Sequence, residues 1–412
     1  MTPVTTVTTA PETRSAARTR VVVHVGAPKT GTTYLQERLA ANLDTLGRHQ
    51  VVYPILPGGD HFSAALDLID MDWGGQGERV QGAWDELVRD VGAAPDGSTV
   101  IVSHELLAGA TRPQVKKAVQ QLESAGCSDG QSNEVHVVYA ARDLARQIPA
   151  EWQEGIKHRR KRGFAKFTSV IAEAKKGPGA KMWFWRAQDL RGVLTRWGSA
   201  VPAERIHLVT VPPSGADRDE LYHRYCRAMA IDPSWAPATA GGSNTSVGAA
   251  EATLLRRLNK RLKKVDYPNE AYRVLVRQLV VHETLAQRSS TGKGSGKAAI
   301  GADVHAWAAP LAEEWIAWVR EQGIDVVGDL EDLRLPAPDP DARERPVDKP
   351  REKDVADAAL DALVAVLQRA AEHDPDAQPT AHPRLYALGR RVVRRGRRAA
   401  RRVKRTGPGA DA

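Results

Sequence analysis

The chain has 412 residues, of which 42% are hydrophobic and 26% are charged. This balance supplies enough apolar side chains for a sizeable core and excludes a chain that is disordered throughout. No apolar run approaches the length of about 18 residues that a membrane-spanning helix needs. The cysteines, Cys127 and Cys226, are too few for a disulfide framework, and residues 1–20 lack the apolar segment of a secretory signal. We therefore expect a cytoplasmic protein.

The net charge of +9 comes from the C-terminal end of the chain. Residues 384–412 hold 11 lysines and arginines against one acid, Asp411, so this tail alone carries +10. Taking +10 from +9 leaves −1 for residues 1–383. The body of the protein is close to neutral, and the overall charge says nothing about its ligand.

Short apolar, β-branched runs alternate with segments of helical periodicity. Strands are predicted at residues 21–25, 51–53, 99–102, 135–139 and 206–211. Helices are predicted from residue 35 to 43 and at 62–68, 84–91, 113–125, 144–157, 181–197, 221–229, 249–265, 270–286 and 304–322. This alternation predicts an α/β fold with a central parallel sheet flanked by helices, to which the helices after residue 214 are additions.

The composition divides the chain into four parts. Residues 1–19 are predicted to be a disordered lead-in, and residues 20–334 form the α/β domain. Residues 335–352 are a proline-rich, charged linker. Residues 353–412 form a helical, arginine-rich appendage that includes the basic tail.

The first loop has the composition of a phosphate-binding loop. Gly26-Ala27-Pro28-Lys29-Thr30-Gly31-Thr32-Thr33 follows a predicted strand and opens a predicted helix. Free amides at the helix N-terminus, the Lys29 ammonium and the threonine hydroxyls suit an anion there. A nucleoside-triphosphate P-loop has lysine directly after its second glycine, whereas here Thr32 follows Gly31.

This loop closely resembles the 5′-phosphosulfate loop of the sulfotransferase family. In that family a later strand leads to an arginine, and a serine eight residues further on joins it in holding a 3′-phosphate. Arg142 matches the arginine, and Ala150 stands in place of the serine. Segments 142–153, 206–213 and 244–259 also resemble a group of bacterial sulfotransferase-like proteins, and the resemblance covers residues 20–333.

The resemblance implies a P-loop-like sulfotransferase fold and an enzyme that uses 3′-phosphoadenosine 5′-phosphosulfate. The sulfuryl group would pass to a hydroxyl or amine of a small-molecule, glycan or lipid acceptor by in-line transfer, without a metal ion. Residues 26–33 and Arg142 would bind the donor, and Lys29 would stabilise charge on the departing 5′-phosphate. The sequence leaves two alternatives open: a non-catalytic nucleotide-binding relative, and a kinase that uses ATP.

Three residues are candidates for the base that takes the acceptor's proton. His61 follows the second predicted strand, and His104 and Glu105 follow the third. The carboxyl ends of parallel strands are where such a sheet binds ligands. The sequence does not choose among the three.

Basic segments give further expectations. The run at residues 157–162 either attracts an anionic donor or acceptor or forms a solvated helix end. The tail at residues 384–405 is a solubilising tail, a contact with anionic lipids at a membrane surface, or a nucleic-acid contact. The nucleic-acid contact is the least favoured because no nucleic-acid-binding motif accompanies the tail.

Overall fold

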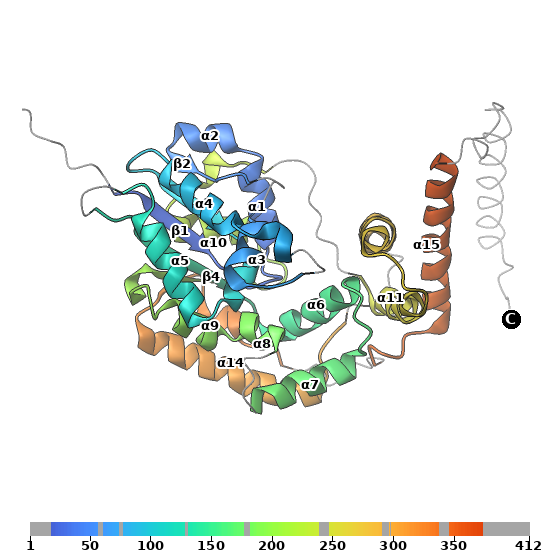
Figure 1. Cartoon of the computed structure of the whole chain (residues 1–412). Helices are drawn as coiled ribbons and strands as arrows, with labels where there is room; N and C mark the ends of the chain where they lie inside the picture. Colours follow the sequence, from blue (N-terminus) through green and yellow to red (C-terminus); the bar gives the residue numbers. More distant parts are fainter. Residues whose placement is uncertain are drawn as a thin grey trace, which may run out of the picture. The chain divides into compact units, whose positions relative to one another are not determined.

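Parallel strands form one sheet in the order β2-β3-β1-β4-β5-β6. Strands β1, β2 and β4 are labelled in Figure 1. The computed structural model describes residues 18–56, 61–73, 77–127, 131–176, 182–238, 247–290, 296, 298–337 and 346–373. The strands are β1 (Arg20–His24), β2 (Val51–Val52), β3 (Thr99–Ser103), β4 (Glu134–Ala141), β5 (Ile206–Thr210) and β6 (Asp325–Val327). The predicted fold class, an α/β fold with a central parallel sheet, is confirmed.

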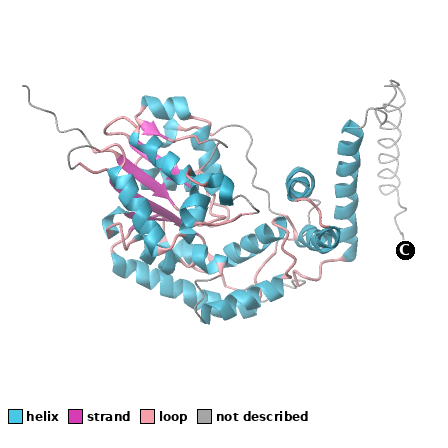
Figure 2. Cartoon of the chain, viewed as in Figure 1, coloured by secondary structure: helices cyan, strands magenta, loops and turns pink. Residues whose placement is uncertain are grey.

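Helices lie on both sides of the strands (Figure 2). The α-helices are α1 (Thr32–Ala40), α2 (Leu43–Arg48), α3 (Phe62–Ile69), α4 (Ala83–Gly92), α5 (Arg112–Ser124), α6 (Leu144–Lys157), α7 (Phe164–Lys176), α8 (Trp183–Gln188), α9 (Leu190–Trp197), α10 (Glu220–Met229), α11 (Ala249–Leu262), α12 (Asn269–Ala271), α13 (Ala286–Ser290), α14 (Ala302–Gln322) and α15 (Glu352–His373). Two other helices matter for the site: the 3-10 helix η2 (Glu105–Gly109) and the π-helix η7 (Tyr272–Leu285).

The centre of the sheet is the β1 strand. Val21, Val22 and Val23 are fully buried, as expected for a parallel strand that is covered on both faces. On one face, side chains of α1, α2 and α10 form a single apolar cluster with Val22 of β1 and Val138 of β4. On the other face, α5 and α9 contact β4. Burial on both faces fixes where β1 ends, and therefore where the loop after it begins.

The strand order reverses direction between β1 and β4. The chain moves from β1 toward β3 and β2 on one side, and crosses to β4, β5 and β6 on the other. The carboxyl ends of β1 and β4 are therefore adjacent and are followed by connections that diverge. Ligands of open parallel sheets bind at such a point. The first loop begins at the carboxyl end of β1, and Arg142 directly follows the carboxyl end of β4.

The structure differs from the predicted elements in several places. The short β6 strand was not predicted, because three residues give little alternation to detect. The α7 helix was also not predicted. The predicted helix at 181–197 is interrupted at Asp189. Most of the predicted helix at 270–286 is the π-helix η7, for which the sequence offers no distinct pattern.

The chain divides into two compact units, residues 1–358 and 359–412. This boundary falls inside α15, later than the predicted start of the appendage at residue 353. Residues 1–17 of the predicted lead-in, residues 338–345 of the predicted linker and the basic tail at 384–405 lie outside the described residues.

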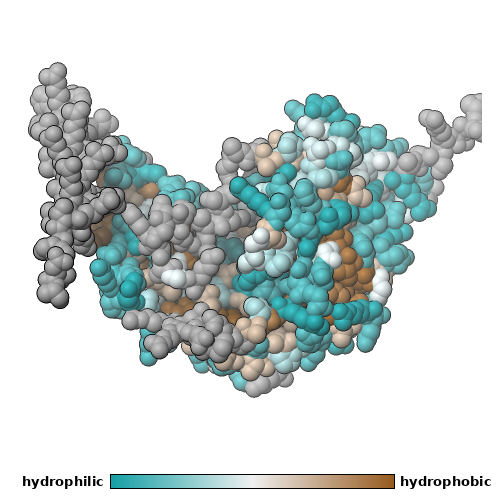
Figure 3. All heavy atoms as spheres, turned by 180° about the vertical axis from the view of Figure 1, so that it is seen from behind, coloured by the Kyte–Doolittle hydropathy of each residue, from teal (hydrophilic) through white to brown (hydrophobic). Residues whose placement is uncertain are grey.

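On the face shown in Figure 3, most of the described surface is hydrophilic, and hydrophobic residues appear in patches between hydrophilic ones. Among the helices of the described ranges, none is both long and apolar enough to cross a lipid bilayer.

Candidate functional site

The loop between β1 and α1 has an unusual backbone. Gly26 (φ +101°), Lys29 (φ 66°) and Gly31 (φ 89°) lie in the left-handed region. A Cβ atom at Gly26 would come within 3.0 Å of the Cα of Glu105, so the loop approaches η2 where only glycine fits. Gly31 is the N-cap of α1 and provides no side-chain hydrogen bond to the first turn. The amides of that turn are therefore suited to an anion.

Hydrogen bonds hold the loop in this shape. The Thr30 hydroxyl donates to the carbonyl of Ala27 at 2.6 Å. The side-chain amides of Gln147 and Gln188 donate to the carbonyl of Pro28 at 2.7 and 3.1 Å. The Thr30 hydroxyl, predicted to face the ligand, instead serves the loop itself. Of the predicted binding residues Gly26, Ala27 and Pro28, only Pro28 is among the residues that line the two cavities described below.

Two cavities meet at this loop. The first, the loop cavity, has a volume of about 370 Å³ and is lined by Lys29 to Thr33 and by residues of α6 and η7. The second, the aromatic cavity, has a volume of about 380 Å³. Both volumes lie in the range of small-molecule sites. Four residues line both cavities: Lys29, Thr33, Glu105 and Glu154.

Lys29 lies at the junction of the cavities and forms an ion pair with Glu154. Its Nζ atom is 2.7 Å from the Oε2 atom of Glu154, and the two side chains are 35% and 19% exposed. Burial by itself raises the pKa of Glu154, but the hydrogen bond from His158 and the charges of Lys29 and Lys157 outweigh it. The pKa of Glu154 is therefore held well below its usual range, and the carboxylate stays ionised.

Arg142 lines the loop cavity directly after β4. Its NH1 group donates to the Lys29 carbonyl at 3.3 Å, and its buried Nε atom has no hydrogen-bond partner. Burial, reinforced by the charge of Arg146, lowers the pKa of Arg142 to about 10. The neighbouring carboxylate of Asp143 pairs with Arg146 instead. Arg142 is thus a cation with an unused buried donor beside the loop.

Ala150 lies on α6 and lines the loop cavity together with Arg142. A serine there would place a hydroxyl in this cavity, whereas alanine provides none. The loop cavity therefore has its arginine without the accompanying hydroxyl.

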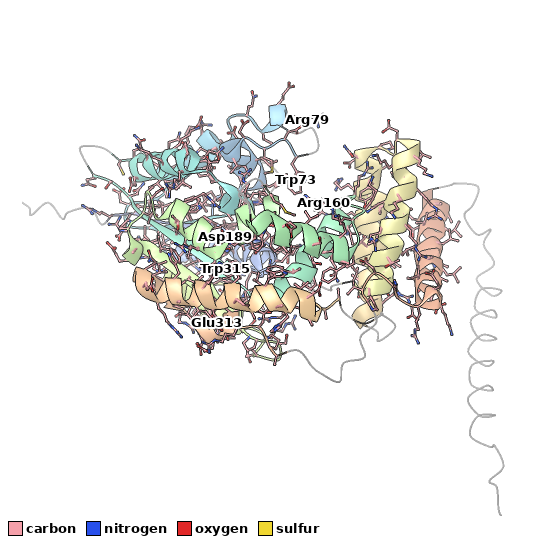
Figure 4. All side chains as sticks on the ribbon, turned by 90° about the horizontal axis from the view of Figure 1, so that it is seen from below. Trp73, Arg79, Arg160, Asp189, Glu313 and Trp315 are labelled. Atoms are coloured by element: carbon pink, nitrogen blue, oxygen red, sulfur yellow. The ribbon has the colours of Figure 1, made fainter. Side chains whose placement is uncertain are left out.

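The aromatic cavity has a wall of ring side chains. Phe62 lies 5.5 Å from His104 and 6.5 Å from Trp73, and Trp73 lies 5.3 Å from His158, between ring centroids. Trp73 and Arg160, both labelled in Figure 4, reach this cavity from the segments that follow α3 and α6. Other rings lining the cavity are Phe167, Trp183 and Phe184. Trp183 thus faces the cavity, whereas the neighbouring Trp185 is buried in the core.

The three predicted bases are in different positions. His61 is fully buried and lines neither cavity, because its Nε2 atom bonds the Pro54 carbonyl at 2.7 Å and its Nδ1 atom accepts from the Ser103 amide at 2.9 Å. The His61 imidazole is therefore used to join β2 to β3. His104 lines the aromatic cavity, and its Nδ1 atom accepts from the Leu106 amide at 3.2 Å. Glu105 lines both cavities.

The basic run at residues 157–162 is divided between the two cavities. Lys157 lines the loop cavity, whereas His158 and Arg160 line the aromatic cavity. Burial lowers the pKa of Lys157, and the nearby Glu154 carboxylate opposes this shift. The run therefore contributes cations to the site rather than only a solvated helix end.

Sequence reasoning missed several residues of the site. Among them, Glu151 and Glu154 lie on α6, the helix that was predicted after Arg142. Arg277 and His282 come from η7 and line the aromatic and loop cavities respectively. No sequence signal connects that helix to a loop near residue 30, because only the tertiary fold brings them together.

Comparisons with known proteins find one distant structural likeness. No protein-family model and no curated protein matches the chain. A solved structure of a sulfotransferase from Alicyclobacillus acidocaldarius is similar, with 14% sequence identity over 61% of this chain and 98% of its own, at a TM-score of 0.35. This likeness is too distant to argue from, so the function has to be inferred from the site.

A substitution tests the close approach of the loop to η2. Gly26→Ala places a Cβ atom against Glu105 at a positive φ, and we expect it to lower the free energy of unfolding by more than about 1 kcal/mol in urea denaturation. Gly215 is the matched control, since it has φ +92° and an added Cβ atom there would meet nothing within 4 Å beyond its chain neighbours. Equal losses in the two variants would contradict the contact with Glu105.

Proposed function

We propose that the protein transfers a sulfuryl group from 3′-phosphoadenosine 5′-phosphosulfate to a hydroxyl or amine of an acceptor in the aromatic cavity. The observation that carries this proposal is Arg142, whose buried Nε atom lacks a partner beside the loop that holds Lys29. This donor carries a phosphosulfate at the 5′ position and a phosphate at the 3′ position of its ribose, so it needs two separate cationic positions. Lys29 and Arg142 supply them in one cavity.

The residues of the loop cavity fit such a donor. The 5′-phosphosulfate would lie against the amides at the start of α1 and the Lys29 ammonium, which suit an anion electrostatically. The 3′-phosphate would accept hydrogen bonds from the Arg142 guanidinium. Lys157 adds a further cation to the same cavity.

The shared wall of the two cavities suits group transfer. By analogy with phosphoryl transfer, a loose in-line displacement depends on positioning and on stabilising the charge of the leaving group. Lys29 lines both cavities, so it can contact the leaving 5′-phosphate while the acceptor approaches from the aromatic side. The aromatic wall would orient the acceptor and exclude water from the sulfur atom.

Binding of the product nucleotide tests the donor. At 100 times its Kd, 3′-phosphoadenosine 5′-phosphate should stabilise the protein by about 2.7 kcal/mol, measured as a rise in Tm, and AMP should stabilise it less. Arg142→Gln should weaken binding of the 3′-phosphorylated nucleotide by about 10- to 100-fold and leave AMP unchanged. The exposed Arg191→Gln on α9 is the matched control. Stabilisation by ATP–Mg²⁺ alone would favour a kinase and overturn the proposal.

The role of Lys29 is tested by turnover. Lys29→Ala should lower kcat by about 10²-fold or more while the Tm stays close to that of the wild type. The fold should survive, since Lys157 and Arg277 still neutralise Glu154. Release of 3′-phosphoadenosine 5′-phosphate is the readout, with Lys116→Ala on α5 as the control. Activity near that of the wild type in Lys29→Ala would refute the assignment.

The missing hydroxyl at position 150 can be restored. Ala150→Ser should tighten binding of 3′-phosphoadenosine 5′-phosphate by about 3- to 10-fold, the value of one hydrogen bond, without changing the affinity for AMP. Ala145→Ser, on the same helix and outside the loop cavity, controls for the effect on α6. Titration calorimetry gives both affinities. An equal gain for AMP would place the 3′-phosphate elsewhere.

A further inference from the structure

A carboxylate that the sequence did not indicate lies in the aromatic cavity. Glu151 is half-buried on α6, one turn before Glu154, and lines this cavity but not the loop cavity. The Nε2 group of Gln188 donates to its Oε1 atom at 3.1 Å. The same Nε2 group donates to the carbonyl of Pro28 at 3.1 Å. Gln188 therefore ties Glu151 to the residue that precedes Lys29.

Charged groups surround this carboxylate on several elements. Lys29 of the loop, Glu105 of η2 and Glu154 of α6 act on it electrostatically. His104, His158, Arg160 and Arg277 also line the aromatic cavity. Burial raises the pKa of Glu151 to about 7, against the lowering effect of Lys29 and with a further rise from Glu154. A base is most effective when its pKa lies near the working pH.

Building on the proposed sulfuryl transfer, we propose that Glu151 is the base that takes the acceptor's proton and that Gln188 positions it. The acceptor oxygen or nitrogen forms its bond to sulfur as the bond from sulfur to the bridging oxygen breaks. The electron pair of the broken bond stays on the 5′-phosphate oxygen. The acceptor proton passes to a carboxylate oxygen of Glu151 and is later released to water.

The other candidates are less suited to this role. Glu154 is held in the ion pair with Lys29. Glu105 lines the loop cavity as well as the aromatic one, so it also faces the anionic donor. His104 uses its Nδ1 atom as an acceptor, which leaves the proton of the neutral imidazole on Nε2. Glu151 is the carboxylate confined to the acceptor side of the junction.

The first arm of the test needs no acceptor. A carboxyl group whose pKa is raised in the folded state lowers the stability of the protein when it ionises. This loss begins as the pH rises past the pKa of the group in the unfolded chain, and it is complete above the pKa in the folded state. Glu151→Gln should therefore have a higher Tm than the wild type above pH 7, and the difference should shrink toward pH 4.5. The exposed Glu37→Gln on α1 is the matched control. A pH-independent difference would overturn the assignment of the buried, titrating group.

The second arm follows release of 3′-phosphoadenosine 5′-phosphate from the donor, with phenol or water as acceptor, between pH 5.5 and 8.5. The wild-type rate should fall on the acid side with an apparent pKa near 7. Glu151→Gln should lose that limb and about 10²-fold or more of the rate, with nucleotide binding unchanged. Glu105→Gln should keep the limb but move it to lower pH, because the Glu105 charge raises the pKa of Glu151. A retained limb in Glu151→Gln would overturn the proposal.

Gln188→Leu tests the positioning role. The hydrogen bond from Gln188 lowers the pKa of Glu151, so its removal should move the acid limb to higher pH, which a purely structural residue would not do. An unmoved limb would contradict the role of Gln188. Failure of the wild type to bind 3′-phosphoadenosine 5′-phosphate would contradict the proposed function itself. Binding that is intact, with an unaltered Glu151→Gln profile, would contradict only the assignment of the base.

Discussion

The ion pair between Lys29 and Glu154 lies where the two cavities meet, and the geometry of the site depends on it. Lys29 has a left-handed backbone in a loop that starts at the buried end of β1. Its ammonium is fixed by a carboxylate from α6, the helix that follows β4. The pair therefore links the two connections that diverge from the centre of the sheet, at the point where parallel sheets bind ligands.

Glu154 has more cationic neighbours than one carboxylate can neutralise. Besides Lys29 at 2.7 Å, Lys157 lies at 3.5 Å and Arg277 at 3.6 Å from its oxygens. Arg142 adds a further cation to the loop cavity. An excess of positive charge in a partly buried site is costly unless an anion joins it. This excess is the physical reason to expect an anionic ligand.

The part of the site that could be predicted from the sequence follows directly from the strands. Val21 to Val23 identify a buried strand, and the glycines after it identify the loop, so the sequence predicts that Lys29 lies at the end of β1, where it lines the loop cavity. Arg142 could be placed for the same reason, at the end of β4. His61 also follows a strand, but its ring is buried, and there it bonds the Pro54 carbonyl and the Ser103 amide. Proximity to a strand end does not determine the direction of a side chain.

The remainder of the site depends on tertiary packing. Glu151 owes its environment to Gln188, which is 37 residues later in the chain, and to the loop carbonyl that Gln188 also binds. Arg277 enters from a π-helix, for which the sequence offers no distinct pattern. Such residues contribute charge and burial without any motif of their own. Their roles can be read only when the side chains are placed in space.

The most direct test of this account is a crystal structure of the protein grown with 3′-phosphoadenosine 5′-phosphate. The account predicts the nucleotide in the loop cavity, with its 5′-phosphate at the Lys29 ammonium and the first turn of α1. Its 3′-phosphate should accept hydrogen bonds from Arg142, including the Nε atom that now lacks a partner. A nucleotide bound elsewhere, or bound there with Arg142 turned away from the 3′-phosphate, would contradict the account.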